Sequence, residues 1–343
     1  MKKHLSMKIV VIGMLFFSAS SCTNTLHENV ESGDPLPSWN QGATKDAIKE
    51  FVEDVTNEQS QNFVPVKDRI AVFDNDGNLW SEQPAYFQLF YTIDEVKAMA
   101  PEHPEWYTTQ PYQSVLEDDM NTLASFGEHG LIELVMATHA GNTAEEFESM
   151  VAEWLAKARH PRFDRPYTDL VYQPMLELMA YLEANEFKNF IVSGGGIDFM
   201  RVWVEDVYGI PRDRVVGSSI QTEFVLEDGH AEIRRLAVMD FIDDKEGKPV
   251  GINRFIGRRP IFCSGNSDGD LAMMQYTDSR EGPSFMLYLH HTDAEREWAY
   301  DRESHIGRLD KGLDEAAERG WTVIDMKSDW KVVYPFELEN GSN

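Results

Sequence analysis

Residues 69–77, Arg-Ile-Ala-Val-Phe-Asp-Asn-Asp-Gly, form a short apolar run that ends in two carboxylates, Asp74 and Asp76. A run of this length and composition is typical of a buried strand. Two later segments repeat the pattern: residues 189–192 are followed by Ser-Gly-Gly-Gly, and residues 260–263 are followed by Ser-Gly-Asn. Because ligands of open α/β sheets bind beyond the carboxyl ends of the strands, we expect these three polar runs to meet.

The elements around these strands alternate between helix and strand along most of the chain. Apolar spacing predicts helices over residues 44–59, 114–126, 143–158, 175–184, 197–208 and 309–319. Thr44 is expected to be the N-cap of the first of these helices. Further strands are expected at residues 214–216, 284–289 and 321–324, and residues 222–226 and 231–235 flank Asp228-Gly229 as a hairpin. The fold class is therefore α/β, with a parallel, doubly wound sheet.

One long segment breaks this alternation. Residues 83–186, between the first two core strands, are helix-rich and interrupted by prolines, and a crossover between parallel strands needs far fewer residues. We therefore expect an inserted helical domain. The predicted organisation is a signal peptide over residues 1–21, a flexible tether over 22–43, the first part of the core over 44–80, a helical cap over 81–187 and the second part of the core over 188–335.

The residues at the strand ends have uses in phosphoryl transfer. A carboxylate such as Asp74 can attack phosphorus, and a second one, Asp76, can protonate the leaving oxygen and then deprotonate water. The hydroxyl of Ser193 and the amides of the following glycines suit phosphate oxygens. A lysine, either Lys248 or its rival Lys245, would neutralise the clustered negative charge. Carboxylate or amide oxygens from the third polar run would complete an octahedral Mg²⁺ site.

Taken in order, residues 74–79, Ser193, Lys248 and residues 265–270 resemble the four motifs of the haloacid dehalogenase superfamily. Within that superfamily the chain is most similar to the phosphoserine-phosphatase-like branch. The resemblance covers roughly residues 66–330. It implies a Rossmann-like core with a helical cap inserted after the first motif, which agrees with the insertion expected from the segment lengths.

The resemblance also implies a role for each matching residue. Asp74 would be the nucleophile and a Mg²⁺ ligand, and Asp76 would be the general acid/base, with its backbone carbonyl on the metal. Ser193 and Gly194 would bind phosphate, and Lys248 would hold the nucleophile and the phosphate together. Because the dehalogenases proper lack a carboxylate at the position of Asp76, that residue favours a phosphatase.

Two asparagines depart from the family pattern. Asn78 stands where the family usually has threonine, and its amide is expected to replace that hydrogen bond in the phosphate site. Asn266 stands where many members carry an aspartate that ligates Mg²⁺, and it can offer a carbonyl oxygen without a charge. Asp270 matches the second acidic position and is expected in the metal shell, with Asp268 as a reserve ligand. The sequence therefore predicts a Mg²⁺ affinity weaker than usual for the family.

Several other polar residues have a functional and a structural interpretation. In phosphoserine-type relatives a glutamate shortly after the first motif contacts the substrate amine. Glu82 lies near that position but not in perfect register with it, and it equally fits a linker. Residues without metal-ligand spacing, or at the amino end of a strand, are interpreted as structural or solvated: His139, His160, His290, His291, Arg258 and Arg259.

The amino terminus has the pattern of an export signal. Lys2, Lys3 and Lys8 precede an apolar stretch over residues 9–17, which is too short to span a bilayer, and small residues lead to Cys22. This resembles a bacterial lipoprotein signal, in which Cys22 is lipidated and begins the mature chain. An ordinary cleaved signal peptide with an incidental cysteine is the alternative. We expect an exported protein, anchored by lipid to a bacterial membrane and facing the periplasm.

The composition excludes some classes of function. The formal net charge is −28, and removal of residues 1–21, which carry three lysines and no acid, makes it −31. Such a surface repels nucleic acid, and it requires any phosphate site to depend on local cations. The only cysteines are Cys22 and Cys263, so no disulfide framework or thiolate metal cluster can form.

The combined prediction is a Mg²⁺-dependent phosphatase that acts on a small phosphorylated metabolite beneath its cap. Two alternatives stay open. Transfer of the phosphoryl group to an alcohol would use the same aspartyl-phosphate intermediate. A lipid-anchored binding protein on a catalytically decayed scaffold would account for Asn78 and Asn266. The sequence does not identify the phosphomonoester or the oligomeric state.

Overall fold

The computed structural model describes residues 33–340 of the chain. The predicted signal peptide, Cys22 and the first part of the tether lie outside the described residues. Leu36 and the residues that follow it form one compact unit. None of the helices within residues 33–340 is both long enough and apolar enough to cross a bilayer.

The sheet contains eight strands in the order β4-β3-β2-β1-β5-β6-β7, with β8 pairing with β6. Strands β3, β2, β1, β5, β6 and β8 are parallel where they pair with one another, whereas β4 and β7 are antiparallel to their neighbours. The strands are β1 (Ile70–Phe73), β2 (Lys188–Gly196), β3 (Val215–Glu227), β4 (His230–Phe241), β5 (Phe262–Gly265), β6 (Phe285–Thr292), β7 (Ala299–Tyr300) and β8 (Thr322–Asp325).

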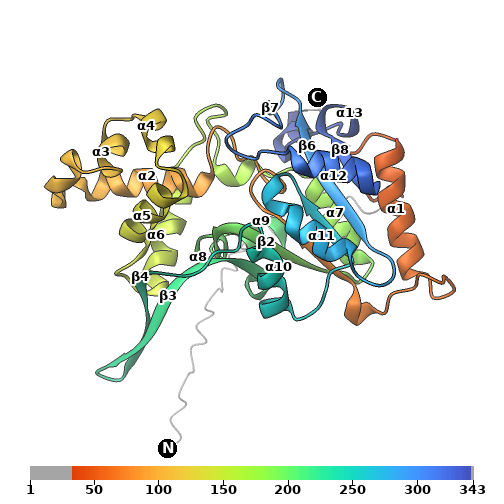
Figure 1. Ribbon diagram of the computed structural model, residues 1–343, viewed down its shortest axis with the longest axis horizontal. Helices are drawn as coiled ribbons and strands as arrows, with labels where there is room; N and C mark the ends of the chain where they lie inside the picture. The colour runs from red at the N-terminus through yellow and green to blue at the C-terminus, as the bar shows by residue number, and fades with distance from the viewer. Residues whose placement is uncertain (1–32, 341–343) are drawn as a thin grey trace, which may run out of the picture. The chain divides into compact units, whose positions relative to one another are not determined.

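The helices surround this sheet or belong to the insertion after β1 (Figure 1). Those that precede β2 are α1 (Ala43–Thr56), α2 (Phe87–Met99), α3 (Tyr112–Leu116), α4 (Met120–Ser125), α5 (Gly127–His139), α6 (Ala144–Lys157) and α7 (Gln173–Ala184). Those that follow β2 are α8 (Ile197–Met200), α9 (Val204–Tyr208), α10 (Gly247–Gly251), α11 (Leu271–Asp278), α12 (Lys311–Arg319), α13 (Met326–Asp329) and α14 (Pro335–Asn340).

Strand β1 shows why the sheet is covered on both faces. All four of its residues are buried, and successive side chains of a strand point to opposite faces. Ala71 and Phe73 pack in one cluster with apolar residues of α1 and α7. Ile70 and Val72 pack in another cluster with Met273 of α11 and Ala316 of α12. The chain therefore has the predicted α/β class, with a central parallel sheet between two helical layers.

Helices α2 to α6 form the helical insertion, and α2, α3, α4 and α5 share a small apolar core of their own. Helix α7 falls inside the range predicted for the cap, 81–187, but it packs on the sheet: the Asn189 side chain of β2 donates through Nδ2 to the Met179 carbonyl of α7 at 2.9 Å. It is the helix that leads directly into β2. The other predicted domain boundaries stay predictions.

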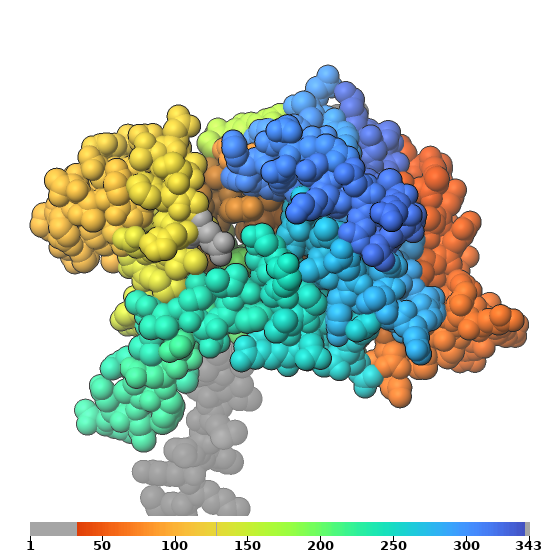
Figure 2. Space-filling view, in the orientation of Figure 1, coloured from red at the N-terminus to blue at the C-terminus, as the bar shows by residue number. Residues whose placement is uncertain are grey.

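A long hairpin of β3 and β4 is the second departure from a plain doubly wound sheet. β3 pairs with β2 over Val215–Ser218 and then continues as the first arm of the hairpin, so the expected short strand and hairpin are one element. The hairpin stands out from the surface in Figure 2, in green-teal beside the yellow insertion. Arg235 of β4 fastens it to the insertion, with its backbone N–H donating to Asn142 and its carbonyl accepting from Gly141.

Three predicted local features differ from the structure. Thr44 does not cap α1, which begins at Ala43, and its hydroxyl instead donates to Asp329 at 3.0 Å. The helix expected over residues 114–126 is broken between α3 and α4, where Asp118 has a φ of 56° and Asp119 caps α4 through its side chain. The helix expected over residues 197–208 is likewise two short helices.

Candidate active site

The three polar runs meet at the carboxyl ends of adjacent strands. In the sheet β1 lies between β2 and β5, and Phe73 is in register with Ile191 on one side and Ser264 on the other. The backbone N–H of Asp74 donates to the Ser264 carbonyl at 2.9 Å. This register brings Asp74, Ser193 and the loop that begins at Gly265 to one edge of the sheet, as the sequence predicts.

Lys248 of α10 is the cation at this edge. Its ammonium group lies 2.6 Å from Asp74 Oδ1 and 2.7 Å from Asp270 Oδ1, and it also donates to the Val192 carbonyl at 2.9 Å. Burial alone would lower the pKa of Lys248, but the two carboxylates raise it above its ordinary value. The rival Lys245 is largely exposed and pairs with Asp244, so Lys248 is the lysine that the fold brings to Asp74.

The two carboxylates of the first motif differ in their surroundings. Burial, with the charge of Asp270, raises the pKa of Asp74 well above its ordinary value, although Lys248 opposes this. Burial raises the pKa of Asp76 to about 6, against the hydrogen bond that Trp80 Nε1 donates to its Oδ1 at 2.7 Å. Trp80 is held in turn by Trp203, whose ring stacks on it at 4.1 Å. A carboxyl group that titrates near neutral pH suits acid/base work.

Ser193 and Gly194 lie at the end of β2, beside Asp76 and the insertion. The Ser193 hydroxyl accepts a hydrogen bond from the Gly195 N–H at 3.1 Å, and a β-carbon on Gly195 would lie 3.5 Å from Asp76 Oδ2. The Gly196 N–H is already bonded, since it donates to Gln88 Oε1 of α2 at 2.8 Å. The Ser193 hydroxyl, which can still donate, and the Gly194 amide are therefore the groups of this run that can meet a phosphate.

Asn78 does not have the role predicted for it. Its side chain is fully buried, with Nδ2 donating to the Asp74 carbonyl at 3.1 Å and Oδ1 accepting from the Ser264 hydroxyl at 2.8 Å. Both ends of the amide are thus engaged between β1 and β5. Asn78 braces the loop that carries Asp74, and it does not face a phosphate.

In the third loop the side-chain oxygens differ in their hydrogen bonds. Asp270 Oδ1 accepts from Lys248, and its Oδ2 accepts from the backbone N–H groups of Asn266 and Ser267. Asp268 Oδ1 accepts from the N–H groups of Asp310 and Gly312 at the start of α12. In contrast, Asn266 Oδ1 is buried and has no hydrogen-bond partner. Both oxygens of the predicted metal ligand Asp270 are therefore occupied in holding the loop and Lys248, and one oxygen of its reserve Asp268 holds the start of α12.

These contacts allow a test of whether the site fits Mg²⁺. Among residues 33–340 no group of three or more His, Cys, Asp and Glu side chains could hold a metal ion. A Mg²⁺ ion takes few protein ligands and keeps several waters. The carboxylate of Asp74, the backbone carbonyl of Asp76 and the buried, unpartnered Oδ1 of Asn266 are oxygen donors of the right kind. The residues present therefore fit a Mg²⁺ site in which the Asp74 carboxylate is the one charged side-chain ligand.

Several residues outside the predicted site build this site, including Glu82, which equally fits a linker by sequence, and His291, which the sequence pattern indicates to be structural or solvated. Glu82 is buried against Asn266, and the His291 ring donates to the Gly77 carbonyl at 2.7 Å, which holds the first loop from β6. Asp243 is fully buried beside the Ser193 backbone, and burial raises its pKa to about 7. These contacts join residues far apart in the chain, so no local pattern could have indicated them.

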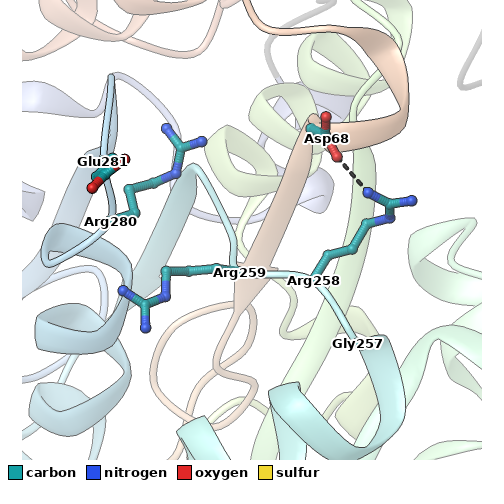
Figure 3. A pocket seen from close by; sticks show the side chains of 6 residues that line it. All are labelled: Asp68, Gly257, Arg258, Arg259, Arg280 and Glu281. Atoms are coloured by element: carbon teal, nitrogen blue, oxygen red, sulfur yellow. Dashed lines mark hydrogen bonds and ion pairs between the residues drawn. The ribbon is translucent and has the colours of Figure 1, made fainter.

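The arginines predicted to be structural lie away from the site. Arg258 and Arg259 precede β5 and line a pocket with Asp68 and Arg280, where their guanidinium groups point in different directions (Figure 3). Arg258 forms an ion pair with Asp68, and Arg259 lies over the Tyr276 ring. Their contacts agree with the structural interpretation.

Comparisons with known proteins give one family match. A model of the haloacid dehalogenase-like hydrolases matches residues 71–275, which is more than half of the chain. A search of curated proteins found no significant match.

Similar solved structures share little sequence identity with this chain. A protein of unknown function from Bordetella pertussis Tohama I is 16% identical, with a TM-score of 0.46, over 75% of this chain and 98% of that one. A functionally unknown protein from Anaerococcus prevotii DSM 20548 is 16% identical, with a TM-score of 0.49, over 84% and 94%. A phosphoserine phosphohydrolase-like protein from Francisella tularensis is 14% identical, with a TM-score of 0.36, over 73% and 99%.

Proposed function

The chain belongs to the haloacid dehalogenase-like hydrolase family, and from that premise we propose that it is a Mg²⁺-dependent phosphatase of small phosphomonoesters. One observation carries the proposal: the buried arrangement in which Lys248 bridges Asp74 and Asp270, beside an Asp76 whose pKa is raised to about 6. A site of this kind places a nucleophile, a cation and a proton donor at one edge of the sheet.

In the first step the Asp74 carboxylate attacks phosphorus, and the bond from phosphorus to the leaving oxygen breaks. Asp76 in its acid form gives its proton to that oxygen, so that an alcohol leaves and Asp74 carries the phosphoryl group. In the second step the Asp76 carboxylate takes a proton from water, whose oxygen attacks phosphorus. Inorganic phosphate is released, and both aspartates return to their starting states.

Lys248 and the end of β2 prepare this chemistry. Lys248 fixes Asp74 through Oδ1, so the approach of the carboxylate to phosphorus is set before substrate binds. The ammonium charge and the Ser193 hydroxyl balance the negative charge that gathers on the phosphoryl oxygens. A Mg²⁺ ion held by Asp74, Asp76 and Asn266 would supply further charge neutralisation to the same oxygens.

The place of action is also part of the proposal. The Cys22 signal pattern supports export and lipid anchoring at a bacterial membrane, facing the periplasm. The acidic surface disfavours nucleic acid as the partner, and a small phosphorylated metabolite would depend on the local cation Lys248 for its binding. Release of phosphate or of an organic moiety from such metabolites outside the inner membrane fits this location.

The test is hydrolysis of a panel of phosphomonoesters with and without Mg²⁺. We expect Asp74→Asn to lower kcat by more than about a thousandfold, whereas the exposed Asp46→Asn should leave it unchanged. Turnover that survives in Asp74→Asn would contradict the proposed nucleophile. Absence of turnover by the wild type on every substrate would favour the binding-protein alternative, and phosphorylated products formed from added alcohols would favour phosphotransfer.

A further inference from the structure

Glu82 is a buried carboxyl group that lies just after the first motif loop. Only 2% of it is exposed, and its Oε1 accepts two hydrogen bonds, each of 2.8 Å, one from Asn266 Nδ2 and one from the Tyr300 hydroxyl. A carboxyl group engaged in this way is directed into the protein. Its surroundings are therefore those of a group that holds other side chains in place.

Two glycines show that the fold is built closely around this carboxyl group. Gly77 and Gly307 come from distant parts of the chain, and their φ angles are 73° and 65°. A β-carbon on either glycine would clash with Glu82 Oε1. On the Gly77 side it would also clash with Asn266 Nδ2. The backbone therefore approaches Glu82 and Asn266 so closely that no side chain fits at these two positions.

The contact with Glu82 determines which way the Asn266 amide is turned. Glu82 Oε1 already accepts from Tyr300, so the amide end that faces it must be the donor, Nδ2. The carbonyl end, Oδ1, is then held away from Glu82, buried and without a hydrogen-bond partner in the protein. Burial of a carbonyl oxygen without a hydrogen-bond partner is unfavourable in free energy, because the oxygen has lost its contacts with water. A bound cation would compensate for this loss.

We propose that Glu82 is a positioning residue for the Mg²⁺ site: it fixes the Asn266 amide so that the oxygen is presented to the metal. This role rests on the proposed function, and it explains how a neutral asparagine can serve as a Mg²⁺ ligand. A freely turning amide would present its NH₂ group to a cation for part of the time. With Nδ2 held on Glu82, the oxygen is preorganised for the metal.

The experiment measures Mg²⁺ binding to the purified protein by titration calorimetry, without substrate. Glu82→Met keeps the side-chain length but cannot accept from Nδ2, and we expect it to weaken Mg²⁺ binding by about tenfold or more. Glu82→Gln keeps a carbonyl oxygen for both donors and should stay within about threefold of the wild type. Tyr300→Phe, which removes the other hydrogen bond to the same oxygen, is the matched control and should also stay within about threefold.

Thermal unfolding in Mg²⁺-free buffer accompanies each titration, because a merely structural role would lower the melting temperature without changing Mg²⁺ affinity. Should Glu82→Met fail to fold, Glu82→Ala serves in its place. Wild-type affinity in the folded Glu82→Met or Glu82→Ala protein would overturn the positioning role and leave the phosphatase proposal intact. Equal weakening by Glu82→Gln and Glu82→Met would also overturn it. Absence of Mg²⁺ binding by the wild type would overturn both this role and the metal dependence of the proposed function.

Discussion

Replacement of Lys248 by methionine tests the electrostatic centre of the site. The change keeps the length of the side chain and removes an ammonium group that lies 2.6 Å from Asp74 and 2.7 Å from Asp270. Both carboxylates are nearly or wholly buried, so each loses its counter-charge in a place largely shielded from water. Removing one partner of a buried ion pair costs about 3–5 kcal/mol of unfolding free energy.

This free energy converts into a measurable shift of the melting temperature. With an unfolding entropy of about 2.1 cal/mol/K per residue, a unit of roughly 300 residues has about 0.6 kcal/mol/K, so we expect Tm to fall by about 5–8 °C. The matched control is Lys245→Met, whose exposed pairing with Asp244 is worth at most about 1 kcal/mol. Calorimetry in one buffer measures both variants.

Activity gives an independent result for the same pair of variants. Loss of the Lys248 charge should lower kcat by about a hundredfold or more, because a preorganised charge at the reacting group is lost. Lys245→Met should retain wild-type kcat. The reasoning would be refuted by a Tm shift for Lys248→Met no larger than that for Lys245→Met, or by equal activity of the two.

Three further predictions address protonation and metal. Asp76→Asn should slow the first step, measured as leaving-group release within the first turnover, by about 10²–10⁴-fold for alkyl phosphates and by much less for p-nitrophenyl phosphate, whose leaving group needs no proton; equal losses in that first-turnover release would contradict its role as general acid. Burial lowers the pKa of His139 from 6.5 to about 3, and His139 Nε2 faces the Gln88 amide. Because the pKa of His139 is lower in the folded than in the unfolded state, its contribution to the free energy of unfolding is complete above pH 6.5. This contribution is lost as pH falls below 6.5, by about 2 kcal/mol at pH 5. The melting temperature of His139→Gln should therefore fall less than that of the wild type between pH 7 and pH 5, and identical slopes would refute this. Because Asn266 contributes no charge, half-saturation of activity by Mg²⁺ should lie above about 1 μM, and saturation below that concentration would be inconsistent with the ligand set.

The convergence of the main site residues could be predicted because topology alone enforces it. Parallel strands β2, β1 and β5 are neighbours, so the polar residues that follow them must share one edge of the sheet. Asp74 and Ser193 are placed in this way, as is the loop at Asn266. The choice of Lys248 over Lys245 followed from motif spacing, and the structure supplies its reason, since α10 directs Lys248 inward.

What sequence patterns could not reveal are the contacts that turn and brace these groups. Asn78 has the position of a phosphate-site residue but is used to join β1 to β5, because the Ser264 hydroxyl lies within 2.8 Å of it. Glu82 meets Asn266 across 184 positions in the chain, and Gln88 meets Gly196 across 108. No periodicity or local motif in the sequence indicates that such distant residues are in contact. They are decided by how the insertion and the loops pack on the core.

The predicted hairpin illustrates a different limit. Its turn at Asp228-Gly229 is a local signal, and the structure has β3 and β4 on either side of it. The length of the hairpin and its attachment to the insertion depend on Arg235, which is buried and donates to the His139 carbonyl at 2.8 Å. A mixed run of charged and apolar residues gives no indication of that contact.

The central claim, that Asp74 receives the phosphoryl group, can be tested directly by trapping the intermediate. The wild-type protein is mixed with a phosphomonoester that it hydrolyses, quenched in acid during the first turnover, digested and analysed by peptide mass spectrometry. We expect the mass of one phosphoryl group on the peptide that contains Asp74, and none in the Asp74→Asn variant. A phosphoryl group on another residue, or the same adduct in Asp74→Asn, would contradict the account.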